Sequence, residues 1–412
     1  MPTPSKYSLI CVAITGALLA GCGESTSSSA GADYGNQDNT TSDFDQTALL
    51  TNLVDGVITP TFEQFVSVSE QQQAGVDAYC TVAVGFEQGN NTQAELTSAQ
   101  QTAQQNWRGA MSVWQQVEMM QLGPLLDDDG ALRNKIYSWP VVSRCGVDLD
   151  VVSFETGNIN GVPYDIANRT PARKGLVALE YLLFNSNLDH SCTESVTPDG
   201  WNNRTEADRI VARCEFAAEI AGDIHNNAQA LVTEWSAADG YAAALKNAGQ
   251  TGSEFDDVHQ AVNKVSDALF YIDSVTKDGK LATPLGLFAN SCGTSVCPED
   301  VESPLAFHSI ENIASNLQAL QSLYSGNEGV GFDDYLVDEN DVETAETLTA
   351  NIQSAITNVQ AYESSLAQTL TDNEQQVTDT HAEVKSVTDQ LKNDFINSLA
   401  LELPQTSAGD ND

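Results

Sequence analysis

Basic residues are scarce in this chain of 412 residues. Lysine and arginine together number 17 against 58 aspartates and glutamates, which gives a formal net charge of −41. A surface of this sign repels nucleic acid and anionic lipid headgroups, and it concentrates cations around itself. The charge therefore argues against nucleic acid as a partner. Solubility in a salty habitat is the simpler explanation of the same charge.

Signatures of several enzyme classes are absent as well. The chain has no His-Glu-x-x-His motif, no Gly-x-Ser-x-Gly turn and no Gly-x-x-x-x-Gly-Lys-Ser/Thr loop. His190, His225, His259 and His381 lie apart in mostly polar surroundings. No Cys-x-x-Cys pair is present either, which argues against a cysteine zinc site.

Long hydrophobic runs are absent beyond the N-terminus. There, Lys6 precedes an apolar run at 9–19 that is too short to span a membrane and is typical of a signal peptide. Leu19-Ala20-Gly21-Cys22 has the form of a bacterial lipobox, with Cys22 as the lipidation site. Because Gly23 rather than aspartate follows, we predict an outer membrane lipoprotein that faces the periplasm or the cell surface.

The cysteines beyond Cys22 form an even set, which in an exported chain indicates disulfides. They are Cys80, Cys145, Cys192, Cys214, Cys292 and Cys297. We expect the pairs Cys80–Cys145, Cys192–Cys214 and Cys292–Cys297. Short intervening loops favour the last two pairs.

Strand signals are sparse, whereas alanine, glutamine, leucine and glutamate dominate long stretches. We therefore expect an all-α fold. Pro60 should kink or interrupt the first helix, and Thr205 followed by Asp208 marks a helix start. Residues 123–171 should be irregular, with Cys145 able to staple them. The expected helices span about 46–80, 92–122, 171–185, 203–236, 254–276, 302–325, 341–371 and 373–402.

The expected helices fall into two groups of four, which predicts two tandem four-helix-bundle-like domains. The N-terminal domain would cover 46–237 and the C-terminal domain 238–405. A signal peptide at 1–21 and a tether at 22–45, rich in Ser, Thr, Gly, Asn and Asp, would precede them. Residues 406–412 would form a disordered tail.

Two acids are candidates for a buried functional site. Glu180 lies in an apolar helix, between Leu176-Val177-Ala178-Leu179 and Tyr181-Leu182-Leu183-Phe184. A helix that is apolar on all sides is normally buried on all sides, and a buried carboxylate needs a partner, a cation or a proton. Glu118 follows Trp114 by one turn on the same face, although most helix glutamates are exposed.

His308 and Glu311 are three residues apart, so they share one face of a helix. Their spacing mirrors the Glu-x-x-His element of di-iron helix bundles, while a surface ion pair is the simpler alternative. The basic residues Arg108, Arg173 and Lys174 could instead neutralise these acids in a structural ion-pair network. Trp139, in the irregular segment, could form the wall of a pocket.

Three segments between about 100 and 190 resemble the imelysin-like proteins. Gly175 and Glu180 occupy the outer positions of the family's Gly-x-His-x-x-Glu motif, with Val177 in place of the histidine. The other two segments are Trp107-Arg108-x-x-Met111-x-x-Trp114-x-x-x-Glu118, running into Gly123-Pro124, and Ile136-x-Ser138-Trp139-Pro140, followed by Cys145 and Asp148. The resemblance implies two packed four-helix arrays in an envelope protein linked to iron acquisition and historically classed as a metallopeptidase.

Together these features predict a lipid-anchored binding protein for iron or another hard cation, with envelope metal-uptake proteins as partners. The candidate metal ligands are Glu118, Glu180, His308 and Glu311. Arg108, Trp139, Asp148 and Arg173 are the candidate pocket or ion-pair residues. A metal-dependent peptidase, or a peptide or polysaccharide binder without metal, would be the alternatives. The link to iron comes from the resemblance alone.

The lipid anchor leads to the first testable prediction. Cys22→Ser should release the protein from the membrane fraction, because the rest of the chain offers no other anchor. Fractionation of cells that express each form, with a high-salt wash, measures this. A Cys22→Ser protein that stays in the membrane fraction after the wash would contradict the prediction.

Overall fold

Most of the described chain is helical. The computed structural model describes residues 43–404 and 407. Within them, the strands β1 (Asn158–Ile159) and β2 (Val162–Pro163) pair antiparallel in a short hairpin, with Asn158 opposite Pro163. The predicted all-α fold is confirmed.

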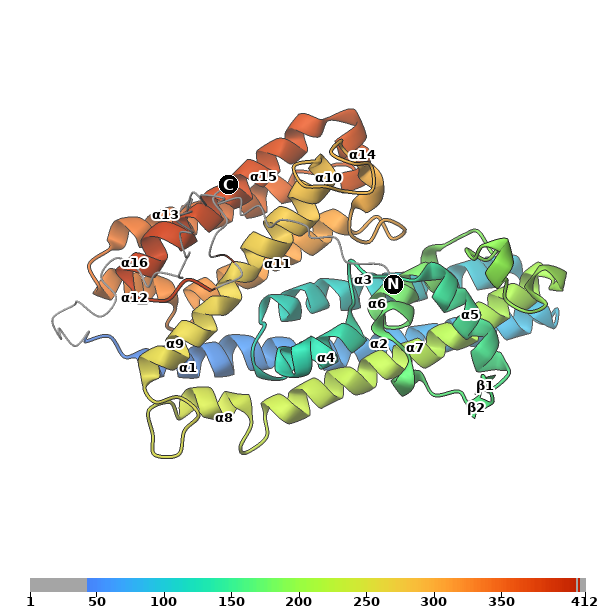
Figure 1. Cartoon of the computed structure of the whole chain (residues 1–412), viewed down its shortest axis with the longest axis horizontal. Coiled ribbons are helices and arrows are strands. Elements are labelled where there is room, and N and C mark those ends of the chain that lie inside the picture. Colours follow the sequence, from blue (N-terminus) through green and yellow to red (C-terminus); the bar gives the residue numbers. More distant parts are fainter. Residues whose placement is uncertain (1–42, 405–406, 408–412) are drawn as a thin grey trace, which may run out of the picture.

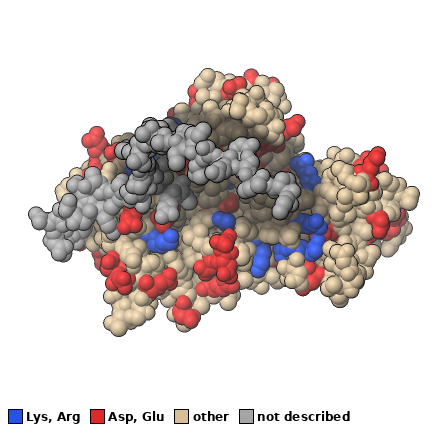
Figure 2. Space-filling view, viewed as in Figure 1, with Lys and Arg blue, Asp and Glu red and all other residues tan. Residues whose placement is uncertain are grey.

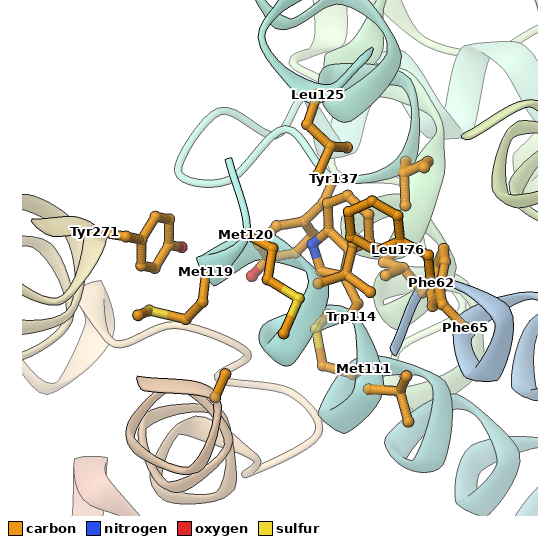
Figure 3. Close-up of a cluster of buried hydrophobic side chains, with 14 of the residues drawn as sticks. Phe62, Phe65, Met111, Trp114, Met119, Met120, Leu125, Tyr137, Leu176 and Tyr271 are labelled. Atoms are coloured by element: carbon orange, nitrogen blue, oxygen red, sulfur yellow. The ribbon is translucent and has the colours of Figure 1, made fainter. Parts of the chain in front are cut away.

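Four helices of the first half pack against one another in a ring. They are α2 (Thr59–Glu87), α3 (Gln93–Met119), α6 (Gly175–Phe184) and α7 (Glu206–Trp235). Phe65 of α2 packs on Trp114 of α3, with Leu176 of α6 nearby in the core (Figure 3). The shorter elements are α1 (Gln46–Asn52), η1 (Leu53–Ile58), η2 (Gly123–Leu125), α4 (Asp127–Ile136), α5 (Arg144–Glu155), η3 (Ile166–Asn168), η4 (Pro171–Arg173), η5 (Glu194–Val196), η6 (Trp201–Asn203) and α8 (Tyr241–Lys246).

A second ring of four follows, made of η8 (Ile272–Ala282), α11 (Ser309–Ser325), α13 (Val342–Gln360) and α15 (Glu374–Gln390). In Figure 1 this group, coloured yellow to red, lies above the first group. Its shorter elements are α9 (Val258–Ser266), η7 (Asp267–Phe270), α10 (Thr283–Leu285), η9 (Pro298–Asp300), α12 (Phe332–Asp338), α14 (Leu366–Asp372), η10 (Leu391–Phe395) and α16 (Ile396–Ser398).

The expected arrangement of two four-helix groups is present, while the domain boundary at 237/238 stays a prediction. The N-terminal segment crosses to the second group. Asn52 of α1 donates hydrogen bonds of 2.9 Å to the carbonyl oxygens of Gly326 and Val330. The N-terminal helix is therefore tied to elements of the second group.

Both longer π-helical segments end immediately before a Thr-Pro pair. The segment η1 leads into Thr59-Pro60, and η8 leads into Thr283-Pro284. Proline lacks an N–H, and its ring clashes with the carbonyl four residues earlier, so a wider π turn relieves the conflict. The disruption predicted at Pro60 is confirmed, as is the helix start at Thr205, which forms a capping box with Asp208.

Two predicted segments differ from the structure. Residues 123–171 are not irregular, since they hold α4, α5 and the β-hairpin. Residues 302–308 are not helical: α11 begins at Ser309, and the preceding loop holds Ser303 and Phe307 at φ values of 50° and 53°. Such positive φ angles are unfavourable for residues with a side chain and stop a helix from starting at 302.

The disulfides correct part of the expected pairing. Cys145 is bonded to Cys192, and Cys292 is bonded to Cys297 as predicted. The pairs Cys80–Cys145 and Cys192–Cys214 are wrong, because Cys80 and Cys214 are buried free thiols on the packed helices α2 and α7. Ser191 donates two hydrogen bonds to Asp148 of α5, and these bring Cys192 to Cys145.

A buried polar network joins the two groups where α3 meets α11. Asn316 of α11 donates to the Gln115 backbone oxygen at 2.8 Å, and Lys280 of η8 donates to Asn316 Oδ1 at 2.8 Å. Lys280 Nζ lies 3.1 Å from Glu302 Oε2, and the Tyr137 hydroxyl donates to Glu302 Oε1 at 2.6 Å. Burial makes these interactions strong and makes the loss of any one partner costly.

The N-terminal predictions fall largely outside the described residues. The signal peptide at 1–21, Cys22 and the tether as far as residue 42 belong to the part that is not described, as does the tail apart from residue 407. Helix α1 begins directly after the predicted tether. In the described part of the chain, no helix combines the length and apolar character that a membrane crossing requires.

Removal of the Lys280 ammonium should destabilise the fold. Lys280→Met leaves the Glu302 carboxylate buried beside an apolar side chain, which should lower the free energy of unfolding by about 3–5 kcal/mol. Urea titration followed by circular dichroism measures the change. The control is Lys246→Met, which removes an exposed ion pair with Asp55 and should cost less than about 1 kcal/mol. Equal effects of the two substitutions would contradict the network's structural role.

Candidate binding cleft between the helix groups

A cleft of about 1180 Å³ lies between the two helix groups. Side chains from α3, α4 and α6 line one side, while η7, η8 and the segments 299–305 and 402–404 line the other. Trp139, Pro140 and Val142 add an apolar edge from the segment between α4 and α5. Clefts at the junction of helix groups are the usual place for ligand sites in such folds.

Glu180 is buried in this cleft, as predicted. Helix α6 is buried along almost its whole length, and Glu180 is only 6% exposed. The helix starts at Gly175, where φ is 71° and an added Cβ would lie 2.5 Å from the Ile136 carbonyl oxygen. Only glycine tolerates this approach, so α6 can dock tightly beneath α4.

The partner of Glu180 is backbone rather than arginine. Its Oε1 accepts hydrogen bonds of 2.9 Å from both Leu305 N–H and Ala306 N–H. Burial raises the Glu180 pKa to about 7, while the two N–H groups oppose the rise. One carboxylate oxygen therefore holds the 302–308 loop of the second group against α6.

Glu118 is the second buried acid of the cleft. Burial raises its pKa to about 7, with Lys280 opposing and Glu302 adding to the rise. Its Oε2 and the Tyr271 hydroxyl are both buried, and each group shifts the pKa of the other. Tyr271 approaches from the second group and lies across from Met119 in Figure 3, and burial and Glu118 raise its pKa well above the ordinary value. The cleft thus holds two buried polar groups, one from each helix group, that interact with each other.

The alternative in which Arg108 or Arg173 pairs with a cleft acid is not formed in the described chain. Arg173 pairs with Asp150 at 3.1 Å, and Arg108 donates to the Ala306 carbonyl at 3.2 Å and lies over the Phe184 ring. The cations that act on the cleft acids are Lys280 and Arg133 for Glu118, and Arg144 for Glu180. Partners of buried acids come from distant segments, which spacing along one helix cannot reveal.

His308 and Glu311 do not line the cleft. His308 precedes α11 and its Nε2 lies 3.0 Å from Ser112 Oγ, while its Nδ1 is 3.8 Å from Glu311 Oε2. Burial and the nearby Arg108 lower the His308 pKa to about 4, so the imidazole is neutral at physiological pH. The contact of His308 with Ser112 joins the two helix groups, whereas Glu311 is exposed.

Asp148 and Trp139 have different roles. Asp148 is fully buried and accepts hydrogen bonds from Tyr181, Ser191 and Arg213, so it holds the segment that follows α6. Trp139 does line the cleft, and its ring lies 5.9 Å from Lys280 Nζ. The expectation that Trp139 forms the wall of a pocket agrees with this position.

The candidate metal ligands do not form one coordination set. Among residues 43–404 and 407, no three side chains of His, Cys, Asp or Glu gather closely enough to hold a metal ion. Glu118, Glu180 and Val177, which takes the place of the motif's histidine, line the cleft without a neighbouring histidine. A bare metal site of four protein ligands is therefore not preorganised here.

Several cleft residues were missed from the sequence. Tyr137 and Tyr271 carry no local signal, because each becomes significant only when segments distant in sequence meet. Arg133 and Arg144 also line the cleft. The scarcity of basic residues could have drawn attention to them, as it did to Arg108 and Arg173.

A comparison with known families decides the affiliation of the chain. The family described as imelysin, peptidase M75, matches residues 58–393. The chain belongs to the imelysin family. The match includes the residues that carry the sequence resemblance and nearly the whole of both helix groups.

Relatives and solved structures agree with this assignment. Iron-regulated protein A of Synechococcus elongatus is 26% identical over 269 residues, and the match spans 63% of each chain, just under two thirds of that protein's length. The crystal structure of an iron-regulated protein A precursor from Parabacteroides distasonis has a TM-score of 0.63 at 17% identity, covering 86% of this chain and 94% of that one. An imelysin-like protein from Psychrobacter arcticum has a TM-score of 0.56 at 15% identity, covering 87% and 96%. These structures share the fold.

The raised pKa of Glu118 predicts a pH-dependent stability. Its pKa is 4.5 in an ordinary setting and about 7 here, so between these values the folded protein holds a proton that the unfolded chain has lost. Stability should therefore fall as pH rises through this window. Glu118→Gln should flatten that fall by about 1–3 kcal/mol, measured by urea unfolding at several pH values. The exposed Glu311→Gln should keep the original profile, and unchanged pH dependence in Glu118→Gln would contradict the argument.

Proposed function

We propose that this protein is an envelope lipoprotein that binds an iron complex in the cleft between its helix groups. The observation that carries the proposal is a cleft of about 1180 Å³ with two buried acids and no cluster of metal ligands in the described chain. Organic ligands occupy cavities of roughly 300–1,000 Å³, whereas a bare ion needs only a few converging ligands. The cleft therefore fits iron that arrives already chelated.

The protonation state of the two acids favours a chelated iron ligand over a bare iron ion. With pKa values of about 7, Glu118 and Glu180 are partly protonated at neutral pH. Glu180 also commits its Oε1 to two backbone N–H groups. Protonated carboxyls and the nearby Tyr271 hydroxyl can donate and accept hydrogen bonds with an oxygen-rich ligand, but they are poor ligands for a free cation.

The peptidase alternative has less support from the residues of the cleft. A metallopeptidase needs about three protein ligands with an open position and a general base. The described part of the cleft offers two acids on α3 and α6, with Val177 one turn before Glu180. A peptide or polysaccharide ligand without metal remains the second candidate, favoured by the apolar edge that Trp139 and Val142 provide.

The proposal also includes a cellular location and partner proteins. A lipid on Cys22 and a tether at 22–45 would hold the folded part at the outer membrane. Iron-regulated protein A carries iron in its name, and by analogy we assign this chain to envelope iron acquisition, with other metal-uptake proteins as partners. The proposal rests on the cleft for the type of ligand and on the family for the metal.

Binding measurements test this function. The Cys22→Ser chain, released from the membrane, is titrated with ferric citrate, a neutral ferric trihydroxamate and haem, and separately with ferric chloride at pH 5. Quenching of tryptophan fluorescence, with Trp139 in the cleft, reports binding. We expect at least one chelate to bind with one molecule per chain and with about tenfold loss in Glu118→Gln.

Two outcomes would overturn the proposal. Binding of ferric ion alone, abolished in both Glu118→Gln and Glu180→Gln, would establish a bare-ion site instead. Absence of binding for every chelate would exclude the chelate function. The exposed Glu311→Gln is the matched control, since it removes one carboxylate outside the cleft lining and should bind as the parent does.

A further inference from the structure

Most lysines and arginines of the described chain pair with a carboxylate. Such ion pairs occur at Arg169, Arg173, Lys174, Arg204, Arg209, Arg213, Lys246, Lys264, Lys277, Lys280, Lys385 and Lys392. Arg108, Arg133, Lys135 and Arg144 are the exceptions among residues 43–404 and 407. In a chain with 58 acids, an unpaired arginine needs an explanation.

Two of these exceptions line the cleft, namely Arg133 and Arg144. They lie at the end of α4 and the start of α5, on the wall formed by the first helix group. Figure 2 shows basic side chains along the recess between the two groups, with acids beside them and over the rest of that face. Arg133 and Arg144 thus offer positive charge in the cleft without an ion-pair partner in the described chain.

Arg133 is held in place by neutral groups. Its guanidinium donates to Gln121 Oε1 at 2.9 Å and to Asn134 Oδ1 at 3.2 and 3.3 Å. It also packs over Gly130, where an added Cβ would lie 2.8 Å from Nη2. Although three aspartates stand at 127–129 in the same element, none of them pairs with Arg133. The arginine is oriented by neutral groups and forms no ion pair in the described chain.

Arg144 stands at an unfavourable position for stability. It is the exposed first residue of α5, where the positive end of the helix dipole repels a cation. No hydrogen bond or ion pair of its side chain is present within the described chain. Its positive charge acts on the cleft, because it lowers the pKa of Glu180 against the larger effect of burial. Cys145, the next residue, fixes this end of α5 through its disulfide with Cys192.

The acids that line the cleft form no ion pair with Arg133 or Arg144 in the described chain. Glu118 and Glu180 are partly neutral because burial raises their pKa values. Asp267 is paired with Lys264, and Asp300 accepts hydrogen bonds from the Ser291 N–H and hydroxyl. Glu299 and Glu402 lie with the second group. Arg133 and Arg144 thus face the cleft from the α4–α5 side without an ion-pair partner in the described chain.

We propose that Arg133 and Arg144 bind the carboxylates of an anionic ferric chelate, which makes polycarboxylate complexes of iron the substrate class of the cleft. This inference rests on the proposed function and narrows it. A guanidinium offers a planar fork of donors that matches a carboxylate, and charge-assisted bonds of this kind strengthen away from water. The strongly acidic exterior repels anions, so the two arginines also select the place at which such a ligand docks.

The test compares an anionic and a neutral chelate. The Cys22→Ser chain and its Arg133→Gln, Arg144→Gln and double variants are titrated with ferric citrate, a neutral ferric trihydroxamate, iron-free citrate and inorganic pyrophosphate. Each single substitution should weaken ferric citrate about tenfold, equivalent to about 1.4 kcal/mol, and the double variant about a hundredfold. In these variants, the affinity for the neutral chelate should change less than about twofold. The salt dependence of ferric citrate binding should be weaker in the variants than in the parent chain. Iron-free citrate should bind more weakly than ferric citrate.

Arg209→Gln is the matched control, because it removes one arginine charge that pairs with Asp189 away from the cleft lining. It should bind ferric citrate as the parent does. Thermal unfolding verifies that each variant is folded. If Arg133→Gln does not fold, Arg144→Gln still tests the proposal, because Arg144 is exposed and its replacement should not disturb the fold. The lysine variants Arg133→Lys and Arg144→Lys should recover part of the affinity.

The outcomes distinguish the anionic substrate class from the proposed binding of an iron chelate. Chelate binding that the double variant leaves unchanged, or a preference for the neutral chelate, would overturn the anionic substrate class and leave the chelate function intact. Equal or tighter binding of pyrophosphate would assign the wall to phosphate anions and overturn the carboxylate class. Failure of every chelate to bind the parent chain would refute both.

Discussion

The cleft depends on the buried ion pair between Lys280 and Glu302. Lys280 comes from η8 and Glu302 from the loop before α11, and both reach Gln115 of α3 at the contact between the two helix groups. A buried charge must be compensated, so this pair has few alternative arrangements. It fixes the second group against the first, and the separation of the cleft walls follows from that position.

Glu180 has two roles that a surface acid could not combine. Its Oε1 holds the backbone of Leu305 and Ala306, and through them the loop that completes the cleft wall. Its burial also keeps the pKa near neutrality, beside Glu118 with a similar pKa. The cleft therefore has acids that are partly protonated, facing arginines without carboxylate partners. Such an interior suits a ligand with its own charges better than an isolated cation.

The local features of the fold were predictable from the sequence. Helix content followed from composition, and the start of α7 followed from Thr205 and Asp208, because a capping box involves residues three apart. Burial of Glu180 followed from the apolar residues on both sides of it. The Cys292–Cys297 pair followed from its short loop. In each case the interacting groups lie within one or two helical turns or one short loop.

Partner choice across long sequence distances was decided only by the tertiary structure. Cys145 bonds to Cys192 because α5 and the segment after α6 meet at Asp148, and nothing in the sequence specifies that meeting. Likewise Arg133 and Arg144 became candidate site residues only when the walls of the cleft came together. Sequence alone determined which residues prefer to be helical or buried, since those preferences are local. The packing of the two helix groups determined which charges meet and which stay unpaired, because such contacts depend on the positions of many elements at once.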